Sequence, residues 1–198
     1  MIIVDELKEG FNIMLHPKSA TQKERKIGEA LAFYYKISII PLILYIILAL
    51  VVPSTSAAGL STLSAGLSSA SGMLAIFGIL MLLIIIPISI FVNAFLYHIF
   101  GKLFKVFSNP YSNTFTAMVY GIVPAILFYW LTLIPFGSLV LIIFGIWAFI
   151  VMIFALANQQ NTSALKAFAV IIVTAIIIGI IAFIIGLSTI LSLATTAK

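Results

Sequence analysis

Five apolar runs dominate this sequence, and each is long enough to cross the hydrocarbon core of a membrane. A transmembrane helix needs about 20 apolar residues, and runs of that length occupy residues 31–52, 73–101, 115–134, 136–156 and 167–187. The runs do not alternate apolar with polar residues, which excludes the strands of a membrane β-barrel. Because hydrocarbon offers no partners to backbone polar groups, the runs must form helices. We predict an all-α fold, a polytopic transmembrane five-helix bundle.

Composition agrees with this assignment. The chain is 64% hydrophobic and 8% charged, whereas soluble domains average about 45–50% apolar and about 25% charged residues. The sequence therefore predicts an integral membrane protein. The chain contains no cysteine, which excludes disulfides, thiolate nucleophiles and thiolate metal sites.

The charges divide the chain into two parts. All five acidic residues precede residue 30: Asp5, Glu6, Glu9, Glu24 and Glu29. Since charge is expelled from hydrocarbon, we predict a short amphipathic cytoplasmic head at residues 1–30 and a membrane domain at 31–198. Within the head, Ile3, Leu7, Phe11 and Met14 recur at helical spacing, which predicts an amphipathic helix that ends near His16 and Pro17. This helix could lie in the membrane interface, pack on the bundle or bind a partner.

Basic residues indicate the orientation. With five spans, nine of the ten Lys and Arg residues fall on one side of the membrane. The positive-inside rule then predicts a cytoplasmic N-terminus and an external or luminal C-terminus. The opposite side carries a degenerate repeat of small residues at 58–71, either a flexible connector or a surface helix. Orientation explains the net charge of +5, and we expect no nucleic-acid partner.

Residues that could carry chemistry are scarce. No carboxylate occurs after residue 29, and the two histidines, His16 and His98, lie far apart in the sequence. This pattern excludes the paired buried carboxylates of an intramembrane aspartyl protease, argues against zinc sites and weakens proton-coupled transport. We therefore predict a non-enzymatic protein with no catalytic residues, no cofactor and no metal.

Two rows of polar residues lie within predicted spans. The rows are Ser89, Asn93 and Tyr97 on the second span, and Thr116, Tyr120 and Pro124 on the third. Uncharged polar residues usually join membrane helices by hydrogen bonds, and that role is favoured here. The alternative is a small cavity for a lipid headgroup or a solute.

The predicted cytoplasmic face supplies candidate contacts with lipid or with a protein partner. These candidates are Lys23, Arg25, Lys26, His98, Lys102, Lys105 and Lys166. A basic residue near an anionic bilayer surface gains about 1 kcal/mol, so membrane lipids are the expected partners. The sequence does not define an oligomeric state.

The order of several motifs resembles the YIP domain family. The residues that carry the resemblance are Phe115, Tyr120 and Pro124, then Ile134-Pro135-Phe136-Gly137, Trp147 and Lys166-Ala167, with Phe11, Leu15 and Pro17 in the head. The resemblance implies five spans and a cytoplasmic N-terminus, as in prokaryotic-looking members. Eukaryotic members interact with Rab/Ypt small GTPases, but their Asp-Leu-Tyr-Gly-Pro motif is absent here. The resemblance thus supports the fold and the topology better than it supports GTPase binding.

Two functions remain open from the sequence. The favoured one is membrane organisation, trafficking or partner recruitment through the cytoplasmic face. The alternative is a transporter or channel for a small solute or a lipid, suggested by the polar rows and by Pro41, Pro87 and Pro124 within spans.

Overall fold

The computed structural model describes residues 2–56, 76–134 and 136–196 and, within them, only helices and connecting turns. The small-residue repeat at 58–71, Pro135 and Lys198 lie outside the described residues. The head forms α1 (Ile2–Leu15) and a single turn, α2 (Pro17–Ala20). Since α1 ends at Leu15, the predicted end near His16 and Pro17 is confirmed.

Four helices in the described ranges are long and apolar enough to cross a membrane. They are Ile27–Ala49, Ile76–Leu103, Gly137–Gln159 and Ala164–Gly186. The first lies within α3 (Ile27–Ser56), and the third coincides with α7 (Gly137–Gln159). The last lies within α8 (Ala164–Thr196). These helices match the predicted first, second, fourth and fifth spans to within a few residues at the ends that the structure describes.

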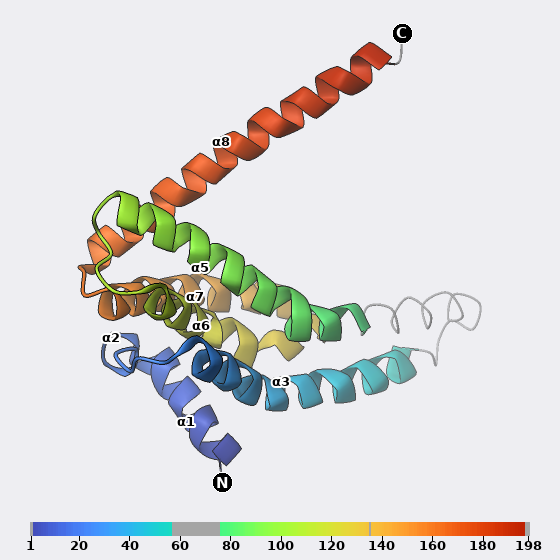
Figure 1. Cartoon of the computed structure of the whole chain (residues 1–198). Coiled ribbons are helices and arrows are strands. Elements are labelled where there is room, and N and C mark those ends of the chain that lie inside the picture. Colours follow the sequence, from blue (N-terminus) through green and yellow to red (C-terminus); the bar gives the residue numbers. More distant parts are fainter. Residues whose placement is uncertain (1, 57–75, 135, 197–198) are drawn as a thin grey trace.

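The remaining predicted span, 115–134, has a different construction. Here α6 (Tyr111–Leu127) is followed by η2 (Tyr129–Leu133), a short 3-10 helix. At 17 residues α6 is shorter than the four apolar helices, and most of its side chains are buried. It packs against α1, α3, α5 and α7, which places it at the centre of the bundle (Figure 1). It is also more polar than α3, α5, α7 and α8.

A π-helical segment, η1 (Met81–Ile85), precedes α5 (Ile86–Leu103). Pro87 in the first turn of α5 has no N–H for the carbonyl of Leu83, and the N–H of Ile86 donates to Met81 instead of Leu82. Both orphaned carbonyls accept hydroxyl hydrogen bonds from α3, Leu82 from Tyr34 and Leu83 from Tyr35. Hydrocarbon supplies no hydrogen-bond partner for such groups, so these two tyrosines satisfy the carbonyls that Pro87 and the π-helical turn leave without a backbone donor.

The connection between η2 and α7 is tight. Phe136 adopts a left-handed conformation with φ of 61°, and Gly137 follows it. A Cβ on Gly137 would lie 1.8 Å from the carbonyl oxygen of Leu131, so no other residue fits this position. The turn returns the chain along α6, which produces an antiparallel hairpin of α6 and α7 (Figure 1).

α8 leaves the bundle. Only its N-terminal part packs against α5 and α7, where Ala167, Val170 and Ile171 are buried. Between residues 175 and 186 its apolar side chains are exposed except for the half-buried Ile177, and the helix leans away from its neighbours (Figure 1). A helix that is apolar on all sides is stable only in an apolar solvent, which agrees with a location in lipid.

Candidate functional site at the charged end

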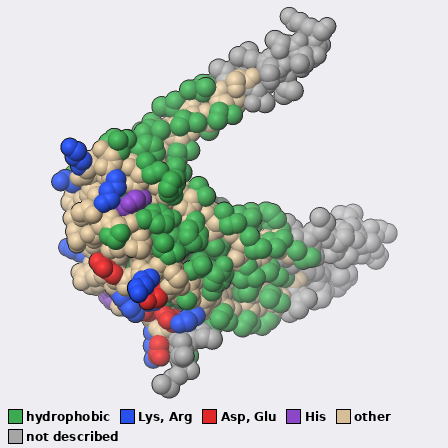
Figure 2. Space-filling view, in the orientation of Figure 1, with side chains coloured by type: hydrophobic (Ala, Val, Ile, Leu, Met, Phe, Trp, Pro, Cys, Tyr) green, Lys and Arg blue, Asp and Glu red, His purple; other side chains and the backbone are tan. Residues whose placement is uncertain are grey.

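Charged side chains gather at one end of the molecule, and apolar side chains predominate on the described surface beyond it (Figure 2). Three segments distant in sequence form this end: the head with its loop 21–26, the α5–α6 connection at 104–110 and the α7–α8 connection at 160–163. We call this region the charged end. The sequence prediction that these three basic regions share one side therefore agrees with their arrangement.

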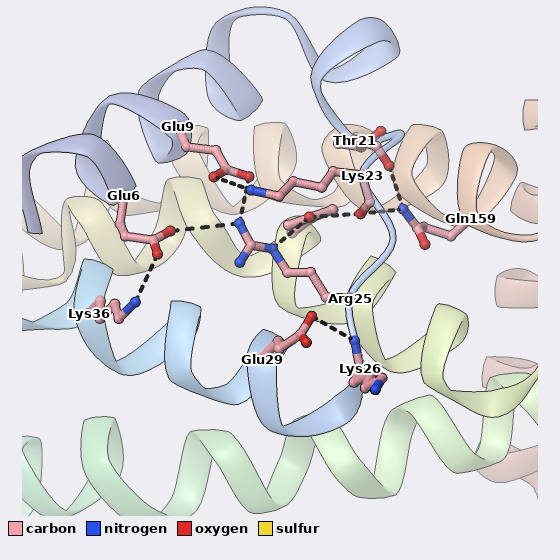
Figure 3. Close-up of polar contacts among 10 residues, drawn as sticks. Glu6, Glu9, Thr21, Lys23, Arg25, Lys26, Glu29, Lys36 and Gln159 are labelled. Carbon is pink, nitrogen blue, oxygen red and sulfur yellow. Dashed lines mark hydrogen bonds and ion pairs between the residues drawn. The ribbon is translucent and has the colours of Figure 1, made fainter. Parts of the chain in front are cut away.

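Arg25 occupies the centre of the head (Figure 3). Its Nη2 donates to Glu9 Oε1 at 2.7 Å and lies 3.6 Å from Glu6 Oε2, while its Nε donates to the Tyr120 hydroxyl at 3.0 Å. The guanidinium also lies 4.4 Å from the ring centroid of Phe33. With its side chain only 8% exposed, Arg25 is committed to contacts within the chain.

Burial by itself lowers the pKa of the Arg25 guanidinium, because it penalises the charged form. The hydrogen bonds to Glu9 and Tyr120 and the Glu9 charge outweigh that cost, so the net pKa lies above the usual range. Arg25 therefore stays charged at every physiological pH. The planar guanidinium group contacts two carboxylates and an aromatic ring at once, and the ammonium group of a lysine could not make all of these contacts.

Two lysines complete the ion-pair cluster. Lys23 Nζ lies 3.2 Å from Glu9 Oε2, and Lys36 Nζ lies 2.9 Å from Glu6 Oε1. The lysine side chains are 59% and 37% exposed, so solvent weakens these pairs more than the Arg25 pairs. The cluster joins α1, the loop and α3, which places the head against the side of the bundle.

The backbone of loop 21–26 is held by α6 and α7. Thr116 Oγ1 donates to the Arg25 carbonyl at 3.0 Å, and the Tyr120 hydroxyl donates to the Lys23 carbonyl at 2.9 Å. From α7, Gln159 Nε2 donates to the carbonyls of Thr21 and Lys23 (Figure 3). Three carbonyls of the loop, those of Thr21, Lys23 and Arg25, therefore accept hydrogen bonds from side chains of α6 and α7.

A second network ties the α5–α6 connection to the end of α7. Asn109 Nδ2 donates to the Gln159 carbonyl at 2.6 Å, and the Asn109 N–H donates to Gln160 Oε1 at 3.0 Å. Gln160 Nε2 in turn donates to Thr114 Oγ1, which lies 2.9 Å from His98 Nδ1. The ends of α5, α6 and α7 thus form one hydrogen-bonded unit that contacts the head through Gln159.

The two predicted polar rows lie on two neighbouring helices, one on α5 and the other on α6, and their side chains form hydrogen bonds with different partners. Thr116 and Tyr120 hold the head, as described above. On α5, Ser89 Oγ donates to the Ile86 carbonyl and Asn93 Nδ2 donates to the Ser89 carbonyl. Of the other row members, Pro124 is buried within α6 and Tyr97 is half-buried on α5. The rows therefore do not form the direct bridge between spans two and three that helix–helix bonding predicts.

Ser89 and Asn93 instead line a pocket of 260 Å³ between α5, α6 and α7. Its remaining wall is apolar and includes Gly121, Gly145 and Met152. The pocket lies along the apolar length of the helices, away from the charged end. Ser89 and Asn93, its polar lining residues, already donate hydrogen bonds to backbone carbonyls of α5.

The other predicted contact residues lie at the charged end. Lys26 is exposed, and its backbone N–H donates to Glu29 Oε2 at 3.3 Å (Figure 3). Lys102, Lys105 and Lys166 are also exposed, and Lys102 Nζ donates to the Ser108 carbonyl. Exposed apolar side chains accompany them in the sequence: Leu103, Phe104 and Leu165.

Sequence reasoning missed several residues that build this end: Glu6, Glu9, Asn109, Gln159 and Gln160. A signal for two of them exists, since Gln159 and Gln160 belong to a polar run that interrupts an apolar segment at 158–161. In the part of the chain that the structure describes, no three His, Asp or Glu side chains are placed to hold a metal ion. The absence of cofactors and metals stays a prediction.

A sequence profile of the Yip1 domain matches residues 11–186, which is most of the chain and includes the four candidate membrane spans of the described residues. The chain belongs to the Yip1 domain family. This membership confirms the resemblance in the motif order and, with the apolar helices, identifies an integral membrane protein. Neither a curated protein nor a solved structure gives a significant match. The match begins at Phe11, so the family signature includes the end of α1 and the loop that contains Arg25.

Proposed function

We propose that this Yip1 family protein is a non-enzymatic membrane protein that organises membranes or recruits a partner through its charged end. The observation that carries the proposal is the joining of the head to the bundle through Arg25, Tyr120 and Gln159. Together with the bonds from Asn109 to Gln159 and Gln160, they hold the head and the α5–α6 connection on the ends of α6 and α7. A preorganised polar surface loses less conformational entropy on binding than a mobile one.

In this proposal the charged end faces the cytoplasm and α6 with η2 makes a fifth crossing. A helix of 17 residues covers about 25 Å, and the five residues of η2 add about 10 Å. Together they match a hydrocarbon core of about 30 Å. The polar start of α6 stays shielded because α3, α5 and α7 pack around the helix.

The contact surface proposed for the partner consists of Lys102, Lys105 and Lys166, with Lys26 and His98 at its edge. Described acidic residues lie in the head, where Glu6 and Glu9 are engaged by Arg25, Lys23 and Lys36. Lys102 at the end of α5, Lys105 in the α5–α6 connection and Lys166 at the start of α8 have no ion-pair partner among these carboxylates and keep their positive field. Anionic lipid headgroups or an acidic protein surface fit it, and the family resemblance adds a small GTPase to the partners to test.

Affinity purification from membranes tests this proposal. We expect the triple variant Lys102→Gln, Lys105→Gln, Lys166→Gln to lose most of the co-purified protein or anionic lipid. The matched Lys→Arg triple keeps the charge and should retain it. If wild type and both variants co-purify the same lipids and proteins in the same amounts, the charged end is not the contact surface.

The pocket beside Ser89 and Asn93 supports a second candidate, a transporter of a small solute or a lipid. Its probe is transbilayer movement of a fluorescent phosphatidylcholine in liposomes that contain the purified protein. This candidate expects movement faster than in protein-free liposomes, and slower movement in Asn93→Leu. Equal rates with and without protein would eliminate phospholipid transport.

A further inference from the structure

α1 has three faces, and one of them is apolar and uncovered. The bundle-facing side contains Ile13, which is fully buried, and Gly10, where a Cβ would lie 3.6 Å from Val123 and 3.7 Å from Ile37. At its end, Trp147 Nε1 of α7 donates to the Met14 carbonyl at 2.7 Å. These contacts place α1 firmly against the side of the bundle.

The second face consists of Val4, Phe11 and Leu15. At about 100° per residue these three side chains occupy a sector of about 40°, and they are 52%, 40% and 62% exposed. The sequence leaves open what the stripe of Leu7, Phe11 and Met14 contacts. In the structure Leu7 and Met14 are half-buried and Phe11 is exposed, while the fully packed side of α1 contains Gly10 and Ile13.

The third face is polar and contains Asp5, Asn12 and His16, all exposed, with Lys8 at its border. Glu6 and Glu9 lie about 140–160° from the apolar sector. Their carboxylates bind Arg25 and Lys36. Since the ion-pair cluster is on one side of α1 and the sector is nearly opposite, the sector points away from the charged residues.

The position of α1 along the length of the bundle indicates what covers its exposed apolar face, which consists of Val4, Phe11 and Leu15. Glu6 pairs with Lys36, the last charged residue before the apolar length of α3. On that length Ile39, Ile43 and Ile47 are exposed, as expected of lipid-facing positions. α1 thus lies where the charged end meets the membrane-spanning surface (Figure 2). A helix with adjacent polar and apolar faces at such a boundary lies in the plane of the interface.

We propose that α1 is an interfacial membrane helix whose Val4, Phe11 and Leu15 insert between lipid headgroups and acyl chains. The bundle covers one side of α1, lipid covers the second, and the polar side faces water. A partner that binds this helix would then contact the polar face, which consists of Asp5, Lys8, Asn12 and His16, instead of the apolar face. The inference requires only the membrane location, and it holds whichever side of the membrane the head occupies.

Because the chain has no cysteine, each introduced cysteine carries a unique spin label. The variants are Phe11→Cys and Leu15→Cys on the apolar face, with Asp5→Cys and Asn12→Cys as matched controls on the polar face. The labelled protein is reconstituted in liposomes of phosphatidylcholine and phosphatidylglycerol. Collision of the label with oxygen, which concentrates in hydrocarbon, is compared with collision with a water-soluble nickel complex.

We expect oxygen-to-nickel accessibility ratios at positions 11 and 15 several-fold above those at 5 and 12. Equal ratios at all four positions, or water-like ratios at 11 and 15, would overturn the proposal, because these liposomes contain no other protein to cover the face. All four positions are exposed, so the labels should leave folding intact, which the elution profile in detergent checks. Loss of partner binding in the lysine variants would not alter these ratios, so the two proposals fail independently.

Discussion

Arg25 shows how one side chain can determine the position of a whole segment. It contacts α1 through Glu6 and Glu9, α3 through Phe33 and α6 through Tyr120. Each partner is separated from Arg25 by a different stretch of chain, so no local pattern predicts the set. From sequence alone, Arg25 is a basic residue beside Lys23 and Lys26, and lipid contact is the natural interpretation.

Arg25→Lys should destabilise the protein although it keeps the charge. A lysine can reach one carboxylate but cannot at the same time donate to Tyr120 and stack on Phe33. Hydrogen bonds to charged groups contribute about 1.5–3 kcal/mol, and we expect a loss of that size in thermal unfolding in detergent. Lys26→Ala is the control, because Lys26 is exposed and bonds Glu29 through its backbone. If Arg25→Lys unfolds at the wild-type temperature, the guanidinium contacts do not hold the head.

At the scale of elements, α6 and α7 approach each other closely at Gly121. A Cβ there would lie 2.6 Å from Met152 Cβ and 2.9 Å from Met152 Cα, so a backbone atom of α7 stands in the way. Gly145 on α7 has no such neighbour within 4 Å. Two glycines on adjacent helices thus have opposite roles.

Gly121→Ala should therefore cost about 1–3 kcal/mol through overpacking. Gly145→Ala should be neutral or gain about 0.5–1 kcal/mol, because alanine loses less backbone entropy in a helix. Thermal unfolding of the two variants in the same detergent measures the difference. Equal effects would show that the hairpin of α6 and α7 is looser than its geometry implies.

The apolar membrane helices and the more polar α6 differ in how well the sequence predicts them. α3, α7 and α8 follow from apolar length, because hydrocarbon requires it whatever the neighbours are. The start of α6 does not, since Asn113 and Thr114 are polar and yet buried, with Gln159 and Gln160 as partners. Only tertiary contacts make that start favourable, and the predicted beginning at residue 115 is therefore four residues late.

The candidate site was predictable only in part for the same reason. The residue types at the charged end follow from the positive-inside pattern, and Thr116 and Tyr120 stand out as polar residues in an apolar span. Their role does not follow, because their partners are backbone carbonyls of a loop more than ninety positions away.

At the scale of the whole molecule, the proposed orientation has a direct test. Lys105→Cys and Lys166→Cys should be protected from a membrane-impermeant maleimide in intact cells and become reactive after permeabilisation. Ser61→Cys, between the first two predicted spans, should react without permeabilisation. The reverse pattern would invert the topology, and reaction at all three positions would rule out a single orientation.

The segregation of charge at one end has an electrical consequence. Residues 37–101, 106–165 and 167–197 carry no Lys, Arg, Asp or Glu, so a rearrangement of the membrane helices moves no formal side-chain charge across the bilayer. A voltage acts on such charges with about 2.3 kcal/mol per elementary charge for each 100 mV. A protein built in this way should be indifferent to depolarisation of its membrane.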